Sequence, residues 1–303
     1  MPAGLVAEYQ GKADQIDHVL IDVFDTLVVR TVAPEHVKCV VCRRLAEHYG
    51  TRLRGEWLYA ARRELERELC EAQERRSGEL EFRLDDLNRA LLRELQAHDA
   101  PTFGCVSDAT FVQVAREIEL QVELLVQRPD EDVRAFLHAV QRRGVPITAV
   151  TDTYLPPASI ETMLERHALR AFIRDVFVSN AYMETKRRGS LYDRVLRHIG
   201  VVPGRTLMVG DHELSDAERA RSRGLQVYLI DRQATRARYQ AFVELHREPA
   251  GVLRELERCI PATEIFGELA CVLLLFTARL HAALASRGAG DAFFLSREGE
   301  FLR

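Results

Sequence analysis

The chain has 303 residues, 47% of them hydrophobic and 29% charged, which is typical of a folded protein with a sizeable core. Its 42 basic and 46 acidic side chains leave a net charge of −4, so nothing in the overall charge favours binding to nucleic acid or an anionic membrane. Six scattered cysteines exclude a disulfide scaffold. With no signal-peptide pattern and no apolar run near the roughly 20 residues of a membrane span, we expect a cytoplasmic protein.

The first predicted element is a buried, β-branched strand at residues 18–24. The pattern then becomes helical. Residues 34–49 place apolar side chains on one face and end at Gly50, and residues 54–76 carry Arg and Glu at helical spacing. Two amphipathic stretches follow, near residues 84–97 and 108–127. We therefore expect an all-helical insertion, residues 31–128, after the first strand.

From residue 129 onward, short apolar runs alternate with helical patterns. The predicted helices cover residues 130–143, 157–167, 190–199 and 214–223, and the predicted strands cover 145–150, 175–178, 205–209 and 226–230. Strands separated by helices of this length are typical of a parallel sheet with helices on both faces. The expected fold class is α/β, a Rossmann-like core made of residues 1–30 and 129–232 with the helical insertion as a cap.

Residues 233–303 return to a helical pattern, interrupted by a predicted strand at residues 291–295. That strand has no helix after it to cover its exposed side. We expect a helical extension that contains the beginning of a second, truncated α/β domain.

Polar side chains follow four successive predicted strands. They are Asp22 and Asp25, then Thr151 and Asp152, then Lys186, and finally Asp211 and Asp216. The carboxyl ends of parallel strands meet at one edge of a sheet, so these groups are expected to converge. Carboxylates bind Mg²⁺ and one of them can attack phosphorus, while a hydroxyl and an ammonium group stabilise phosphoryl oxygens. The set predicts magnesium-dependent phosphoryl transfer.

The segments Asp22-Val-Phe-Asp-Thr26, Thr151, Lys186 and Gly210-Asp-His-Glu-Leu-Ser-Asp216 resemble, in order, the four motifs of the haloacid dehalogenase (HAD) superfamily. The resemblance covers residues 17–232, and the helical insertion is similar to the C1-type cap of that superfamily. It implies that Asp22 is the nucleophile and that Thr151 and Lys186 are catalytic. It also implies a Mg²⁺ ion held by Asp22, the Phe24 carbonyl, Asp211 and Asp216.

Residues next to these motifs are candidates for holding a small phosphorylated substrate. They are Thr26, Arg30 and Asp152. The planar guanidinium of Arg30 suits either an anionic substrate group or a surface ion pair.

One position departs from the HAD phosphatase pattern, because Phe24 stands where those enzymes carry a general-acid aspartate. The loss of a general acid lowers the rate by about 10²–10⁴-fold where the leaving group needs a proton. HAD dehalogenases also lack this acid, but they do not use the metal pair that Asp211 and Asp216 resemble. The combination indicates a phosphatase-like hydrolase acting on a substrate with a good leaving group, such as an acyl phosphate, or on a sugar phosphate. Asp25 is an alternative acid.

Other interpretations remain open. Asp211 and Asp216 also fit the first turn of a helix, Lys186 fits a solvated basic run, and Thr151 fits an ordinary strand. The sequences around Asp22 and Thr151, together with the segment Phe294-Leu-Ser-Arg-Glu-Gly299, further resemble a HAD subgroup found beside or fused to glycosyltransferases in surface-polysaccharide loci. That similarity implies a glycosyltransferase partner or fusion. The chain is then a hydrolase, a non-catalytic module of polysaccharide synthesis or, least favoured, a dehalogenase.

Overall fold

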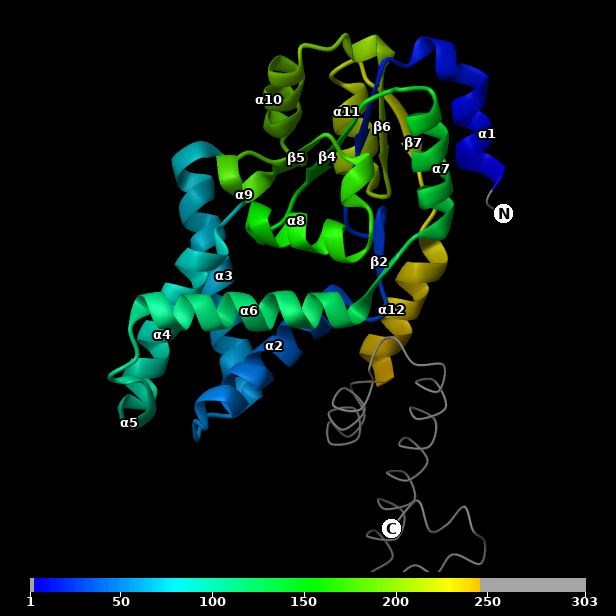
Figure 1. The fold of residues 1–303 in the computed structure, drawn as a ribbon. Coiled ribbons are helices and arrows are strands. Elements are labelled where there is room, and N and C mark those ends of the chain that lie inside the picture. The colour runs from blue at the N-terminus through cyan, green and yellow to red at the C-terminus, as the bar shows by residue number, and fades with distance from the viewer. Residues whose placement is uncertain (1–2, 246–303) are drawn as a thin grey trace, which may run out of the picture. The chain divides into compact units, whose positions relative to one another are not determined.

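A computed structural model describes residues 3–245, which contain a five-stranded parallel sheet in the order β5-β4-β1-β6-β7 (Figure 1). The strands are β1 (His18–Ile21), β4 (Ile147–Thr151), β5 (Asp175–Val178), β6 (Thr206–Gly210) and β7 (Gln226–Leu229). The central strand β1 pairs with β4 on one side and with β6 on the other. The order of strands therefore reverses at β1, and the carboxyl end of β1 is the switch point. The expected α/β fold class is confirmed.

Helices cover both faces of the sheet because neighbouring residues of a strand point to opposite sides (Figure 1). Val19 and Ile21 belong to the core on one face, where α1 (Ala3–Lys12), α7 (Glu131–Arg142) and α8 (Pro157–Arg166) pack. Leu20 belongs to the core on the other face, with α10 (Ser190–Ile199) and α11 (Arg219–Arg221). A sheet covered in this way leaves its carboxyl edge as the place for polar side chains.

The segment from Pro34 to Val126 is helical, as expected, and buries a core of its own. Its helices are α2 (Pro34–Tyr49), α3 (Gly55–Ser77), α4 (Leu84–His98), α5 (Ala100–Phe103) and α6 (Asp108–Val126). Gly50 ends α2 with a left-handed φ of 61°, which a residue without a side chain adopts easily. The insertion bounds of 31 and 128 stay a prediction.

Two short strands join the chain where it enters and leaves the insertion. β2 (Val28–Arg30) pairs antiparallel with β3 (Gln127–Pro129). The sequence does not predict this pair, because strands of three residues show no readable alternation of apolar and polar side chains. The first strand also ends at Ile21 rather than at residue 24, so Asp22 lies just beyond it.

The remaining described elements are short connections and one later helix. They are the 3₁₀ turns Ala13–Gln15, Arg170–Phe172 and Pro203–Arg205, the helix α9 (Ser179–Tyr182), the π-helical turn Glu213–Glu218, and α12 (Gln233–Leu245). Between residues 3 and 245 no helix combines the length and apolar character that crossing a bilayer requires. The strand expected at residues 291–295, like most of the predicted extension, lies outside the described residues.

A buried histidine links the two central strands and predicts a pH dependence of stability. His18 of β1 lies with Nε2 2.9 Å from the Thr148 hydroxyl of β4. Burial lowers the pKa of His18 to about 4, an effect that Arg174 reinforces and Asp175 opposes. The unfolded chain protonates this histidine below about pH 6.5, whereas the buried histidine of the native protein stays neutral until the pH nears its own lower pKa. Between these two pKa values the unfolded chain binds one more proton than the native protein.

The native state therefore loses stability as the pH falls from 6.5 towards 4, by up to about 3 kcal/mol from this group. The variant His18→Gln lacks the titration, and its unfolding free energy should fall less steeply than that of the wild type. Urea unfolding of both proteins at pH 7.5 and pH 4.5 measures the difference. Parallel pH dependences of the two proteins would contradict the assignment to His18.

Candidate active site

Three carboxylates meet at the carboxyl edge of the sheet. Asp22 directly follows β1, Asp211 directly follows β6, and Asp216 lies in the π-helical turn after it. One carboxylate oxygen from each lies within 4.8 Å of the others. Asp22 and Asp216 are buried. The structure thus brings together acids that are almost 200 residues apart in sequence, as the strand-end pattern predicted.

Lys186 completes this cluster from the loop between α9 and α10. Its Nζ donates to Asp22 Oδ1 at 2.5 Å and to Asp216 Oδ1 at 2.6 Å. The lysine is only 2% exposed, so its ammonium group exchanges water for these two carboxylates. Thr151 ends the neighbouring strand β4 at the same edge and is buried beside them.

Asp152, expected to bind substrate, holds the Lys186 loop in this structure. Its Oδ1 accepts the backbone N–H of Lys186 at 2.7 Å, and its Oδ2 accepts that of Arg187 at 3.1 Å. Burial raises the pKa of Asp152, while Lys186 and the two backbone N–H groups oppose that rise. Both oxygens of this side chain therefore serve to position the loop.

Asp216 lies against the end of β6 because residue 210 is a glycine. Its Oδ2 accepts the backbone N–H groups of Asp211 at 3.2 Å and of His212 at 3.1 Å. A Cβ atom on Gly210 would lie only 2.4 Å from this oxygen. The absent side chain of Gly210 is what allows Asp216 to reach the cluster.

Gly210→Ala is expected to displace Asp216, lowering the unfolding free energy by about 1–3 kcal/mol and weakening magnesium binding. Gly204→Ala is the matched control, since no atom of the described residues would lie within 4 Å of a Cβ atom there. Thermal unfolding of both variants, with and without Mg²⁺, measures the two effects. Equal magnesium-induced stabilisation of the two variants would contradict the role of Gly210.

The charge of the cluster suits a divalent cation. Burial is the main cause that raises the pKa of Asp22, and it raises the pKa of Asp211 to about 6. Three carboxylates face the Lys186 ammonium group and the Arg236 guanidinium, which lies 3.4 Å from Asp211 Oδ2, so one negative charge is left over in the cluster. Mg²⁺ prefers hard oxygen ligands and few protein carboxylates. Asp22, Asp211 and Asp216 therefore fit a magnesium ion.

Comparison with known proteins gives the family. The model of haloacid dehalogenase-like hydrolases matches residues 16–224. The chain belongs to this family of hydrolases. Among curated proteins, no sequence is significantly similar to this HAD hydrolase.

Several solved structures are similar to the chain at low sequence identity. The 2-haloacid dehalogenase of Pseudomonas syringae pv. tomato DC3000 is 20% identical, with a TM-score of 0.52 over 71% of this chain and 86% of that one. YfnB of Bacillus subtilis, bound to magnesium, is 18% identical, with a TM-score of 0.47 over 71% and 86%. A protein of Haemophilus somnus 129PT, described as a predicted phosphoglycolate phosphatase, is 14% identical, with a TM-score of 0.44 over 70% and 84%.

Two further residues near the first motif of this HAD hydrolase pack away from solvent. The guanidinium carbon of Arg30 lies 4.0 Å from the centre of the Phe24 ring. Arg30 also donates to both carboxylate oxygens of Glu123 on α6, at 3.0 and 2.8 Å. Thr26 is fully buried, and its hydroxyl has no hydrogen-bond partner among the described residues. The substrate-binding roles expected for Arg30 and Thr26 stay predictions.

A cavity of about 300 Å³ is lined by residues that neighbour the cluster in the sequence, although the three carboxylates and Lys186 are not themselves part of its walls. Its walls come from the loop before α4 and from the residues next to Thr151, Lys186 and Asp211. They are Leu80, Glu81, Asp152, Thr153, Tyr154, Thr185, Arg187, His212 and Ser215. Tyr154 and His212 lie close in the sequence to Thr151 and Asp211, so the motifs could have indicated them. Glu81 lies far from every motif, and no local sequence pattern marks it. This cavity is the candidate substrate pocket.

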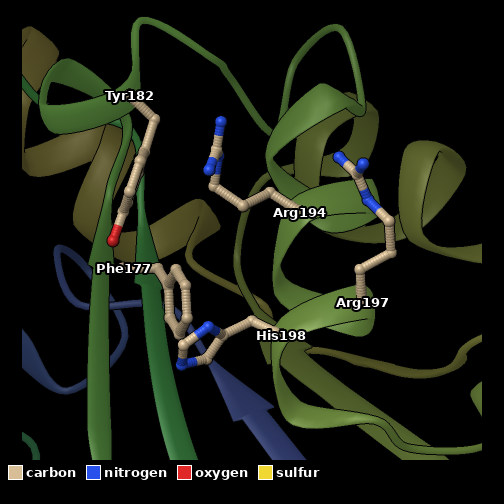
Figure 2. Close-up of a pocket in the computed structure, with 5 residues that line it drawn as sticks. All are labelled: Phe177, Tyr182, Arg194, Arg197 and His198. Atoms are coloured by element: carbon tan, nitrogen blue, oxygen red, sulfur yellow. The ribbon is translucent and has the colours of Figure 1, made fainter.

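A second cavity, of about 320 Å³, lies at the edge strand β5 and α10 (Figure 2). Figure 2 shows the Arg194 guanidinium beside the Tyr182 ring, 4.5 Å from its centre. Arg194 also forms an ion pair with Glu184 at 2.6 Å. None of the residues lining it was predicted to act in catalysis, and the carboxylate cluster is not among them.

Proposed function

We propose that this HAD hydrolase is a magnesium-dependent phosphohydrolase that acts on a small phosphorylated metabolite through a phospho-aspartyl intermediate on Asp22. The observation that carries the proposal is the cluster of Asp22, Asp211 and Asp216, two of them buried, with Lys186 between Asp22 and Asp216. A dehalogenase needs a carboxylate nucleophile but no cation, so excess negative charge around the nucleophile favours phosphoryl transfer. The neighbouring cavity suits a substrate of small size.

In the proposed reaction an oxygen of Asp22 attacks phosphorus, and the bond from phosphorus to the leaving oxygen breaks with its electron pair on that oxygen. The Lys186 ammonium orients Asp22, and the Thr151 hydroxyl donates to a phosphoryl oxygen. Water then cleaves the acyl phosphate and restores the carboxylate. Asp22, Asp211, Asp216 and the Phe24 carbonyl would hold a Mg²⁺ ion, which would neutralise negative charge on the phosphoryl group.

The Phe24 ring cannot donate a proton to the leaving group. We therefore favour substrates whose leaving group departs as an anion at neutral pH, such as an acyl phosphate, an anhydride or an activated sugar phosphate. Asp25 is the nearest alternative acid in the sequence. It adopts a left-handed φ of 54°, and its carbonyl accepts a hydrogen bond from Arg232 at 2.6 Å.

A phosphate-release screen tests this function, with acetyl phosphate, sugar phosphates and p-nitrophenyl phosphate assayed with Mg²⁺ or with a chelator. We expect release that requires Mg²⁺ and is fastest for acetyl phosphate. Halide release from 2-chloropropionate without metal would instead favour a dehalogenase. The absence of turnover and of magnesium binding would favour the non-catalytic module, the alternative to which the loss of the acid at Phe24 points.

We also propose that the protein acts in the cytoplasm beside a glycosyltransferase in surface-polysaccharide synthesis. The support is the sequence of three segments, around Asp22, around Thr151 and at residues 294–299, which resemble that HAD subgroup. The same screen tests the proposal, since it predicts that a sugar phosphate is turned over faster than other phosphate esters. Equal rates for unrelated esters would contradict it.

A further inference from the structure

The position of Lys186 depends on the loop that carries it. The side chain reaches two buried carboxylates from the loop between α9 and α10. A lysine side chain has many rotamers, so placing its ammonium group at the two carboxylates requires a firmly held backbone. Asp152 holds that backbone from the strand side, through the N–H groups of Lys186 and Arg187.

A carboxylate from the helical insertion holds the same loop from the opposite side. Glu79, in the loop between α3 and α4, accepts a hydrogen bond from the Thr185 hydroxyl at 2.6 Å and one from the Ser190 hydroxyl at 2.5 Å. The Ser190 hydroxyl in turn accepts the backbone N–H of Thr185 at 3.1 Å. Glu79 thus connects residues on both sides of Lys186.

Glu79 is 7% exposed, and in residues 3–245 no cation forms an ion pair with it. A buried carboxylate without a cation lowers stability unless its hydrogen bonds are well made. The two hydroxyl donors supply short, charge-assisted bonds that fix both distance and direction. Such an arrangement specifies geometry more than it adds stability.

The same loop holds a second strand-end segment. Glu81 accepts a hydrogen bond from the Ser179 hydroxyl, whose oxygen accepts the backbone N–H of Thr153 at 2.9 Å. Thr153 lies two residues after Thr151. The loop between α3 and α4 therefore contacts two segments, the one that follows Thr151 and the one that carries Lys186. Thr151 and Lys186 are the proposed catalytic residues that do not lie at the ends of β1 and β6.

We propose that Glu79 is a positioning residue that couples the helical insertion to the placement of Lys186. The proposal rests on the function proposed above, because Lys186 matters only if Asp22 reacts. Loss of the Glu79 contacts lets the segment around Lys186 move, and the ammonium group then no longer orients Asp22. Glu79 is not among the residues that line the candidate substrate pocket, so kcat should change more than KM.

The test compares Glu79→Gln with Glu74→Gln in magnesium-dependent release from acetyl phosphate. A glutamine side chain keeps the shape of glutamate, but its amide nitrogen cannot accept a hydroxyl proton. We expect kcat of Glu79→Gln to fall about 10- to 100-fold with KM changed less than about threefold. Glu74 also bridges α3 to this loop, through Arg188 at 3.0 Å, but it is 44% exposed, and its variant should keep the wild-type kcat.

Variants of the partner residue sharpen the test. Thr185→Val should reproduce the loss of kcat, Thr185→Ser should restore most of it, and Glu79→Gln combined with Thr185→Val should lose little more than either alone. Additive losses in the double variant, or a wild-type kcat in Glu79→Gln, would overturn the proposal.

Hydrogen–deuterium exchange gives a readout that does not depend on activity. Faster exchange of residues 183–190 is expected in Glu79→Gln and not in Glu74→Gln. Unchanged exchange in Glu79→Gln would overturn the positioning role even if activity fell. A wild-type protein inert towards every phosphate would overturn the proposed function instead, and the exchange rates would still decide the role of Glu79. If Glu79→Gln fails to fold, the exchange of Thr185→Val decides in its place.

Discussion

Asp22→Asn is expected to abolish phosphate release, lowering kcat at least about 10⁴-fold, because the amide cannot attack phosphorus and no other group replaces a removed nucleophile. The variant should still fold. Asparagine has nearly the same shape as aspartate, and Lys186 keeps its contact with Asp216 at 2.6 Å. The substitution also removes one of the crowded negative charges. Release from acetyl phosphate in the presence of Mg²⁺ measures the loss, and circular dichroism checks the fold.

A carboxylate outside the cluster provides the control. Asp175 opens the edge strand β5, and its side chain is 39% exposed, so Asp175→Asn should retain the wild-type rate. Retention of more than about a tenth of the activity in Asp22→Asn would show that another group is the nucleophile.

Arg62→Met is expected to lower the unfolding free energy by about 3–5 kcal/mol. Arg62 of α3 is 2% exposed and donates two hydrogen bonds of 2.8 Å to Glu119 of α6 and a third of 2.8 Å to Glu66. The Tyr154 hydroxyl, from the segment after β4, also donates to Glu119 at 2.8 Å. Without the arginine, Glu119 is a buried charge with one remaining donor. Urea unfolding measures the loss.

Arg67 on the same helix offers a matched comparison. It pairs with Glu64 and Glu71, but its side chain is 52% exposed, so Arg67→Met should cost no more than about 1 kcal/mol. Replacing both Arg62 and Glu119 with apolar residues should destabilise less than Arg62→Met alone, because no unpaired charge is left. Similar losses in the Arg62 and Arg67 variants would contradict the importance of burial.

The residues that the sequence predicted well are those fixed by short-range patterns. The strands of the parallel sheet show as apolar runs, and the ends of β1, β4 and β6 show as the polar residues that follow them. The topology of a parallel sheet then places Asp22 and Asp211 at the same edge. The local pattern and a general rule of sheet topology together were enough to predict this part of the site.

The remaining parts of the structure depend on contacts between distant segments. The pairing of β2 with β3 involves three residues on each side, too few for a period to show. Arg30 donates a hydrogen bond to Glu123, 93 positions away in the sequence, and Thr185 donates one to Glu79, 106 positions away. In a sequence with 46 acidic residues nothing marks Glu79 as buried rather than solvated. Tertiary packing alone decides which charges face the core.

The most direct test of the account is a crystal structure of the protein with Mn²⁺, which substitutes for Mg²⁺ and gives an anomalous signal. We expect one strong anomalous peak among Asp22, Asp211 and Asp216, with carboxylate oxygens of Asp22 and Asp211 at about 2.0–2.3 Å from the ion. A cluster without such a peak, in crystals that take up the ion elsewhere, would contradict magnesium-dependent phosphoryl transfer at this site.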